Sequence, residues 1–332
     1  MKRLCLFIAA MLLVAKPVPA HHSAAAYDAA SPVTLQGTVT RVDWTNPHVY
    51  IYLDTQGASG SPAQWIIETD PTPILIRSGW TRDSVRVGAL VTVRMNPARD
   101  RQRNHAQLVS LSTGNGAVLV PRAPAARTET RATSIAGVWN SLRGFGQRRF
   151  GTLNVTEKGV AAMKSFDEAA SPIVDCVPHV VPQLPTLPYL SEIEVLNDRI
   201  MMRSEFLNVD RTIYMDGRPH PRDGVRTRQG HSIGRWEGGV LVVDTTLFAD
   251  HRVGNSFGSA FASGLPSGPQ KHVVERYRLS EDSTRMLIEF VVEDPEYLAA
   301  PMTASAEWDY APRQRLQRFG CTPEEARRFT FR

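Results

Sequence analysis

Polar residues that could carry out chemistry gather in the second half of the chain. Their types are those that proteins use to move protons and to hold anions. They are Arg211, Tyr214, Asp216, Arg218, His220, His231, Arg235, Asp244, Glu275 and Arg276, with His251, Glu293 and Asp294 nearby in the sequence. Because such residues line many ligand pockets, this group predicts a small-molecule site.

The group supports a catalytic interpretation and a binding interpretation. In the first, His231 is a general base, and Asp216 or Asp244 orients its ring. Arg235 or Arg218 then holds a carboxylate or an oxyanion. In the second, the ligand contacts are Arg211, Tyr214, Arg218, His220, Asp244, Glu275 and Arg276. A structural alternative also stays open, in which residues 216–219 form a turn and the charges form ion pairs.

Established catalytic motifs do not help to decide between the catalytic, binding and structural interpretations. The chain lacks a His-Glu-x-x-His segment, a phosphate-binding loop and a dinucleotide fingerprint. The segment Gly230–Gly234, GHSIG, resembles a nucleophile elbow but carries its serine at the wrong position. A serine nucleophile therefore has no support.

A second candidate site lies near the N-terminus. Residues 1–20 have a charged start, a short apolar core and the small-residue end VPA, which together predict a cleaved secretory signal. Cleavage after Ala20 would make His21 the first residue, with an amine and an imidazole that chelate one metal ion. His48 would add the third nitrogen of a copper or zinc site, and His22 could assist. The alternatives are a frayed N-terminus and a His48 ring that serves its own turn.

Export also explains the charge and the cysteines. The full chain has 38 basic and 33 acidic residues, but cleavage removes Lys2, Arg3 and Lys16, which leaves 35 basic residues. This small excess gives no reason to expect nucleic-acid binding. After Cys5 is removed with the signal, Cys176 and Cys321 remain, and an oxidising compartment predicts a disulfide between them. We expect a periplasmic or secreted protein with no integral membrane segment after processing.

The spacing of apolar runs predicts two β domains. Residues 21–112 contain three strand-like runs, a short helix and two more runs, the order of an OB-like small barrel. Its core is predicted at Val39, Val49, Ile51, Ile66, Val91 and Val93. After a linker at 113–134, residues 135–332 read as long hairpins of a larger antiparallel β-barrel or sandwich. The proline-rich stretch 176–195 predicts an ordered loop across one mouth of that barrel.

Both halves resemble exported bacterial families that are uncharacterised. The start HHSAAAYD and the segment WTNPH resemble one such family over about residues 21–112. The stretches RTIYMDGRPHP and GHSIGRWEGGVLVVDTT resemble a second family in the C-terminal half. Neither resemblance implies an activity.

Together these observations favour an exported two-domain binding protein. The C-terminal domain would bind a small, part-apolar ligand, and the N-terminal domain would carry a copper or zinc site. The alternatives are an enzyme that uses His/Asp acid–base chemistry with an arginine as anion holder, and a structural interaction module of the cell envelope.

Overall fold

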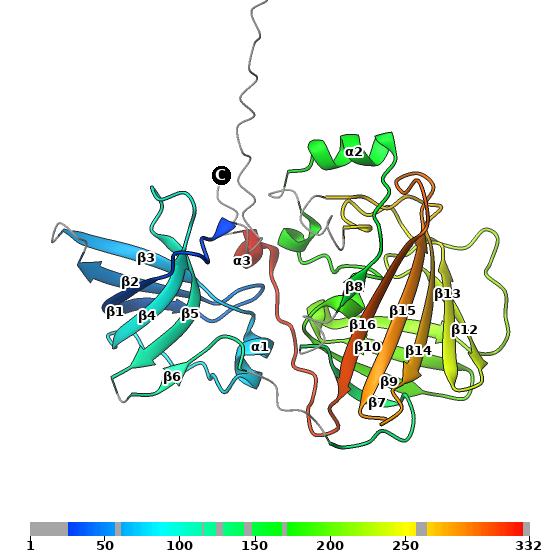
Figure 1. The fold of residues 1–332 in the computed structure, drawn as a ribbon, viewed down its shortest axis with the longest axis horizontal. Coiled ribbons are helices and arrows are strands. Elements are labelled where there is room, and N and C mark those ends of the chain that lie inside the picture. The colour runs from blue at the N-terminus through cyan, green and yellow to red at the C-terminus, as the bar shows by residue number, and fades with distance from the viewer. Residues whose placement is uncertain are drawn as a thin grey trace, which may run out of the picture.

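A computed structural model describes residues 26–56, 61–114, 116–123, 129–142, 148–167, 171–256 and 264–327. The predicted signal segment, His21 and His22 lie outside these residues. Two β domains stand side by side, and the chain's C-terminal segment runs between them (Figure 1). The protein is mostly β, as predicted. In the described part of the chain, no helix is both long and apolar enough to cross a membrane.

The first domain is a closed barrel with the predicted OB-like order of elements. Its elements are β1 (Val33–Asp43), β2 (Tyr50–Gln56), β3 (Pro62–Glu68), α1 (Thr72–Arg77), β4 (Leu90–Pro97) and β5 (His105–Thr113). The strands follow the order β3-β2-β1-β4-β5, and a parallel pairing of β3 with β5 closes the ring. A short strand, β6 (Val118–Leu119), adds to the edge of β5 inside the predicted linker.

The alternation of side chains explains this barrel's core, with one correction. Val39, Ile51 and Val93 are fully buried, as the period-two pattern predicted. The prediction that Ile66 belongs to the core was wrong, because its neighbour Ile67 faces the core instead. The two isoleucines are adjacent, so either register satisfies the apolar pattern, and only the pairing with β2 and β5 decides between them.

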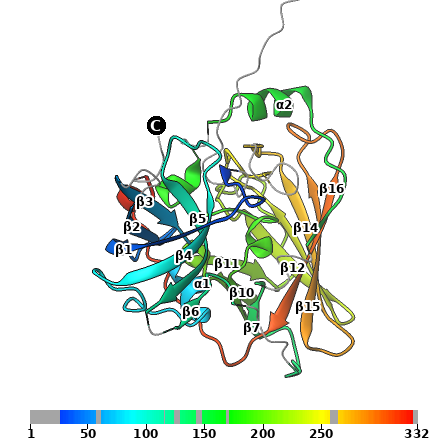
Figure 2. The ribbon, with the colours of Figure 1, turned by 60° about the vertical axis from the view of Figure 1, so that its left-hand side comes forward.

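The second domain is a larger barrel, shown edge-on in Figure 2. Its elements are β7 (Gly137–Asn140), β8 (Arg149–Phe150), α2 (Glu157–Lys164), β9 (Leu190–Val195), β10 (Arg199–Ser204), β11 (Val209–Tyr214), β12 (His231–Glu237), β13 (Val240–Thr246), β14 (His272–Leu279), β15 (Arg285–Glu293), β16 (Met302–Tyr310) and, at the end of the chain, α3 (Pro323–Arg327). Pairing of β15 with β16 closes the ring. Every neighbouring pair described is antiparallel except β11 with β12.

A proline-rich loop packs into the interior of this barrel. It contains two short 3-10 turns, Pro172–Asp175 and Leu184–Thr186. Val181 packs into an apolar cluster with strand residues, and Trp308 donates its indole N–H to the carbonyl of Pro185 at 2.8 Å. Lys271 Nζ fixes the loop by donating to the carbonyls of Val181 and Gly254. The lumen is therefore filled by the chain itself.

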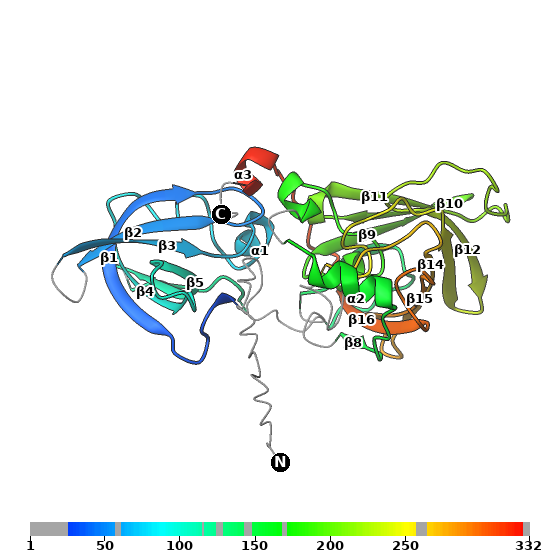
Figure 3. The same ribbon diagram turned by 90° about the horizontal axis from the view of Figure 1, so that it is seen from above.

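One buried ion pair joins the two domains. Arg77, the last residue of α1, places Nη1 2.8 and 2.6 Å from the two carboxylate oxygens of Glu205. The side chain of Glu205 is fully buried, and it also accepts the backbone N–H of Gln317. Around this pair, Ile74 packs against Phe319 and other apolar residues of the second domain. Figure 3 shows α1 at this junction from above.

The predicted disulfide is present, and it holds the end of the chain at this junction. Cys176 and Cys321 are bonded. Next to the bridge, Asn46 donates its side-chain amide to the carbonyl of Gly320 at 3.0 Å, and residues 46 and 321 pair as a short parallel bridge. The C-terminal segment is thus part of the contact between the domains.

Replacing Arg77 by methionine should destabilise the protein by about 3–5 kcal/mol, because the buried Glu205 carboxylate loses its countercharge. Urea unfolding followed by tryptophan fluorescence measures the change. Arg82→Met, at an exposed arginine five residues after Arg77, is the matched control and should be near neutral. A double variant, Arg77→Met with Glu205→Met, should recover most of the loss; an equally large loss in the double variant would contradict the ion-pair explanation.

Candidate functional site

Strand alternation divides the predicted polar residues between two faces of the second barrel. Arg211 on β11 and Glu275 on β14 face the interior and are buried. Tyr214, His231 and Asp244 lie on the opposite, outer face of the same sheet and are partly exposed. The sequence placed all of these residues in one site, whereas the structure forms two separate groups.

The outer group forms a continuous chain of hydrogen bonds, which we call the histidine relay. His231 and His220 meet through their Nδ1 atoms at 2.8 Å, and His220 Nε2 lies 3.0 Å from Asp244 Oδ1. The same oxygen lies 3.1 Å from His272 Nε2, and His272 Nδ1 lies 3.0 Å from Glu293 Oε2. The relay thus crosses β12, β13, β14 and β15.

The carboxylates determine which nitrogen of each ring carries a proton. His272 faces a carboxylate oxygen with both nitrogens, so both are protonated, and these hydrogen bonds raise its pKa to about 9. His220 donates Nε2–H to Asp244, so its Nδ1 accepts a hydrogen bond from the Nδ1–H of His231. The lone pair of His231 therefore lies on Nε2. Burial and the neighbouring His220 lower the pKa of His231, which keeps it a neutral base.

The arginines predicted to hold an anion have other partners. Arg218 pairs with Asp216 and lies over the ring of Tyr214, with its guanidinium carbon 4.1 Å from the ring centroid. Arg235 pairs with Glu237 at 2.6 Å, and Arg276 pairs with the same glutamate. The structure therefore connects His231 to Asp244 through His220. Asp216 and Arg235 form ion pairs with other residues and are not part of the relay.

The inner group is a satisfied network inside the barrel. Arg211 pairs with Glu275 and also donates to Ser232 at 3.0 Å and to Thr245 at 2.7 Å. Tyr277 donates its hydroxyl to Glu275 at 2.6 Å. The cavity beside Arg211 has a volume of only about 30 Å³. This space is too small for an organic ligand.

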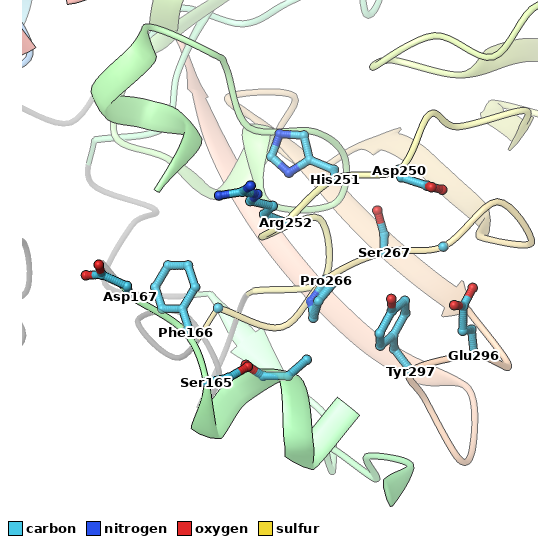
Figure 4. Close-up of a pocket in the computed structure, with 13 residues that line it drawn as sticks. Ser165, Phe166, Asp167, Asp250, His251, Arg252, Pro266, Ser267, Glu296 and Tyr297 are labelled. Carbon is cyan, nitrogen blue, oxygen red and sulfur yellow. The ribbon is translucent and has the colours of Figure 1, made fainter. Parts of the chain in front are cut away.

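A larger pocket lies at the barrel mouth, beneath α2, and we call it the mouth pocket (Figure 4). Its volume is about 580 Å³. Apolar side chains line part of it, including Phe166, Pro266 and Tyr297. Thr156 accepts the N–H of Gly159 and so caps the start of α2, which carries Ala162 over the opening. The mouth pocket is of the size that small organic ligands occupy.

Two polar side chains at the mouth pocket are almost fully buried. Ser267 is 2% exposed, and its hydroxyl has no hydrogen-bond partner in the described part of the chain. His251 accepts the backbone N–H of Val253 on Nδ1 at 3.3 Å, so its proton lies on Nε2. Burial and the nearby Lys271 ammonium lower the pKa of His251 to about 4. The Ser267 hydroxyl therefore lacks a hydrogen-bond partner among the described residues, while the neutral ring of His251 also interacts with the backbone of Pro178.

In the first domain, the predicted ligand His48 has an ordered ring. Its Nδ1 lies 3.0 Å from the carbonyl of Thr69 and 3.1 Å from a carboxylate oxygen of Glu68. Both neighbours accept hydrogen bonds, so Nδ1 carries the proton and Nε2 carries the lone pair. Among the residues that the structure describes, no group of three or more His, Cys, Asp or Glu side chains is arranged to hold a metal ion.

Sequence reasoning missed His272 of the relay and Ser267 of the mouth pocket. His272 could have been found from the sequence, because it is the first residue of a predicted hairpin strand and pairs with Glu293 on the other strand of that hairpin. Ser267 lies in an irregular segment with no periodicity, so the pattern offered no signal for it.

Comparison with known proteins bears on the first domain. The model of a family of unknown function, DUF6152, matches residues 10–107, in agreement with the resemblance noted in that region. No curated protein matches the chain. Among solved structures, a secretary abundant heat soluble (SAHS) protein from Ramazzottius varieornatus is 10% identical and covers 55% of this chain and 100% of its own, with a TM-score of 0.28. So distant a likeness carries no argument about ligand or function.

The two carboxylates beside His272 should make stability depend on pH. Its folded pKa of about 9 exceeds the usual 6.5, so the stabilisation is complete below pH 6.5 and is lost as the pH rises through 9. His272→Gln should remove this dependence in thermal unfolding. Asp244→Asn should lower the His272 pKa measured by NMR, and an unchanged His272 titration in that variant would contradict the relay.

Proposed function

We propose that the C-terminal domain binds a small, part-apolar organic molecule in the mouth pocket. The observation that carries this proposal is the buried hydroxyl of Ser267 at the wall of a pocket of about 580 Å³. A buried polar group without a partner costs free energy, and a ligand that hydrogen-bonds to it recovers that cost. Apolar side chains with a few fixed polar groups are typical of ligand sites.

Binding is favoured over the catalytic alternative because of where the relay lies. The relay offers a base at His231, but its residues and those of the mouth pocket form separate sets. Arg235, the expected anion holder, pairs instead with Glu237. The mouth pocket itself offers the neutral His251, which suits hydrogen bonding to a ligand.

Filling the mouth pocket should abolish binding. Ligand-observed NMR with 2-phenylethanol, which combines an apolar ring with a hydroxyl, tests the proposal. Ala162→Trp places an indole over the pocket opening from α2 and should weaken binding at least about tenfold. Val160→Trp, on the exposed side of the same helix, is the matched control and should not change it. Equal binding by both variants would place the ligand elsewhere.

A copper or zinc site at the mature N-terminus is a second candidate. The arrangement of His48 supports it, since Glu68 and Thr69 orient the ring and leave Nε2 for a metal ion. Tyr27 donates its hydroxyl to the same Glu68, which holds the incoming chain at this ring. Five residues lie between His21 and Tyr27, and the six chain steps from one to the other span at most about 20 Å. The first residue of the mature chain can therefore reach His48.

Copper titration of the processed protein, followed by electron paramagnetic resonance, tests this candidate. His48→Ala should lower copper affinity, because it removes one of three nitrogens. One extra residue ahead of His21 should lower it as strongly, because the amine moves away from the imidazole. Equal copper affinity with and without the extra residue would contradict the site.

Export to an oxidising compartment is part of the same proposal. The disulfide between Cys176 and Cys321 supports it, because such bonds persist outside the reducing cytosol. N-terminal sequencing of the exported protein should show His21 as the first residue. Any other start would remove the amine from the proposed metal site.

A further inference from the structure

One wall of the mouth pocket is formed by carboxylates and an aromatic ring, which we call the acidic wall. Asp250, Glu296 and Tyr297 form it, together with Ser267, whereas Arg252 lies on the other side with Phe166 (Figure 4). Asp250 has no hydrogen bond or ion pair within the described residues. A solvent-facing carboxylate beside an aromatic ring attracts cations.

A third carboxylate lies directly behind this wall. Asp294 is 1% exposed, and its Oδ2 accepts from Asn255 at 2.7 Å and from the N–H of Gly268 at 2.9 Å. Its Oδ1 has no hydrogen-bond partner in the described part of the chain. Gly268 allows this approach: a Cβ there would lie 2.2 Å from Glu296 Oε2 and 3.4 Å from Asp294 Oδ1. The backbone at Gly268 is thus flanked by two carboxylates.

The protein already places an ammonium group at the edge of the acidic wall. Lys158 on α2 pairs with Glu296, and its Nζ lies 5.4 Å from the centroid of the Tyr297 ring. This hydrogen bond raises the pKa of Lys158. Asp250 forms no ion pair with Lys158, although its negative charge also helps to raise the pKa of that ammonium group. The same chemistry, a carboxylate beside a ring, is therefore open to a second ammonium group.

We propose that the ligand of the mouth pocket is an organic amine, bound with its protonated nitrogen at the acidic wall. This inference rests on the proposed binding function. Asp250 would pair with the ammonium group, and Tyr297 would contact it through the ring face. The apolar part of the ligand would lie against Phe166 and Pro266, and the Ser267 hydroxyl would accept one N–H.

Three probes of one shape separate this inference from the binding proposal. 2-Phenylethylamine, 2-phenylethanol and phenylacetate share a ring and a two-carbon arm but are positive, neutral and negative at pH 7. Isothermal titration of each probe into the processed protein should give the tightest binding for the amine, by about tenfold over the alcohol. Asp250→Asn should remove most of that preference, while Asp210→Asn, the same change at an exposed aspartate of β11 outside the pocket, should leave it.

The outcomes distinguish the two proposals. Tightest binding of phenylacetate, or equal binding of amine and alcohol, overturns the amine inference while the binding function stands. A preference for the amine that persists in Asp250→Asn also overturns it, because the nitrogen then lies elsewhere. No binding of any probe contradicts both. Near-UV circular dichroism of each variant confirms that the fold is retained.

Discussion

The pairing of one guanidinium with one carboxylate organises the interior of the second barrel. Arg211 and Glu275 neutralise each other, and Ser232, Thr245 and Tyr277 take up their remaining hydrogen bonds. A barrel interior satisfied in this way needs no ligand to complete it, and the proline-rich loop packs into it. Burying two charges is costly unless their hydrogen bonds are complete, and here they are. Space for a foreign molecule is left at the mouth.

The second domain also holds its histidines in opposite states. His272 lies between two carboxylates and is held as a cation. His251 is buried beside an ammonium group and is held neutral. The same side chain thus serves as a fixed charge on the outer sheet and as an uncharged hydrogen-bonding group at the mouth pocket. Its local environment, rather than the residue type, sets the role.

The sequence predicted the fold more fully than the sites, and there are physical reasons for this. Strand periodicity is local, so the order of elements in the first barrel and the long hairpins of the second followed from it, while the cysteine bridge followed from the two cysteines that remain after the predicted cleavage. Hydrogen bonding between loops and strands is not local. His220 lies between His231 and Asp244 only because the loop after β11 folds back over the sheet. Nothing near Ser267 in the sequence shows that its hydroxyl is buried.

Because the C-terminal segment lies between the two domains, the contact between them can form only after that segment has been made. A polypeptide is made from its N-terminus, so the first barrel can form while the rest is still missing. Ile74 is then uncovered, and Asn46 has no Gly320 to bind. Only when the last residues arrive can Phe319 cover that surface and Cys321 reach its partner. The disulfide therefore records that the chain has been made at least as far as Cys321, since a chain cut short before that residue can neither form the bond nor join the two domains through it.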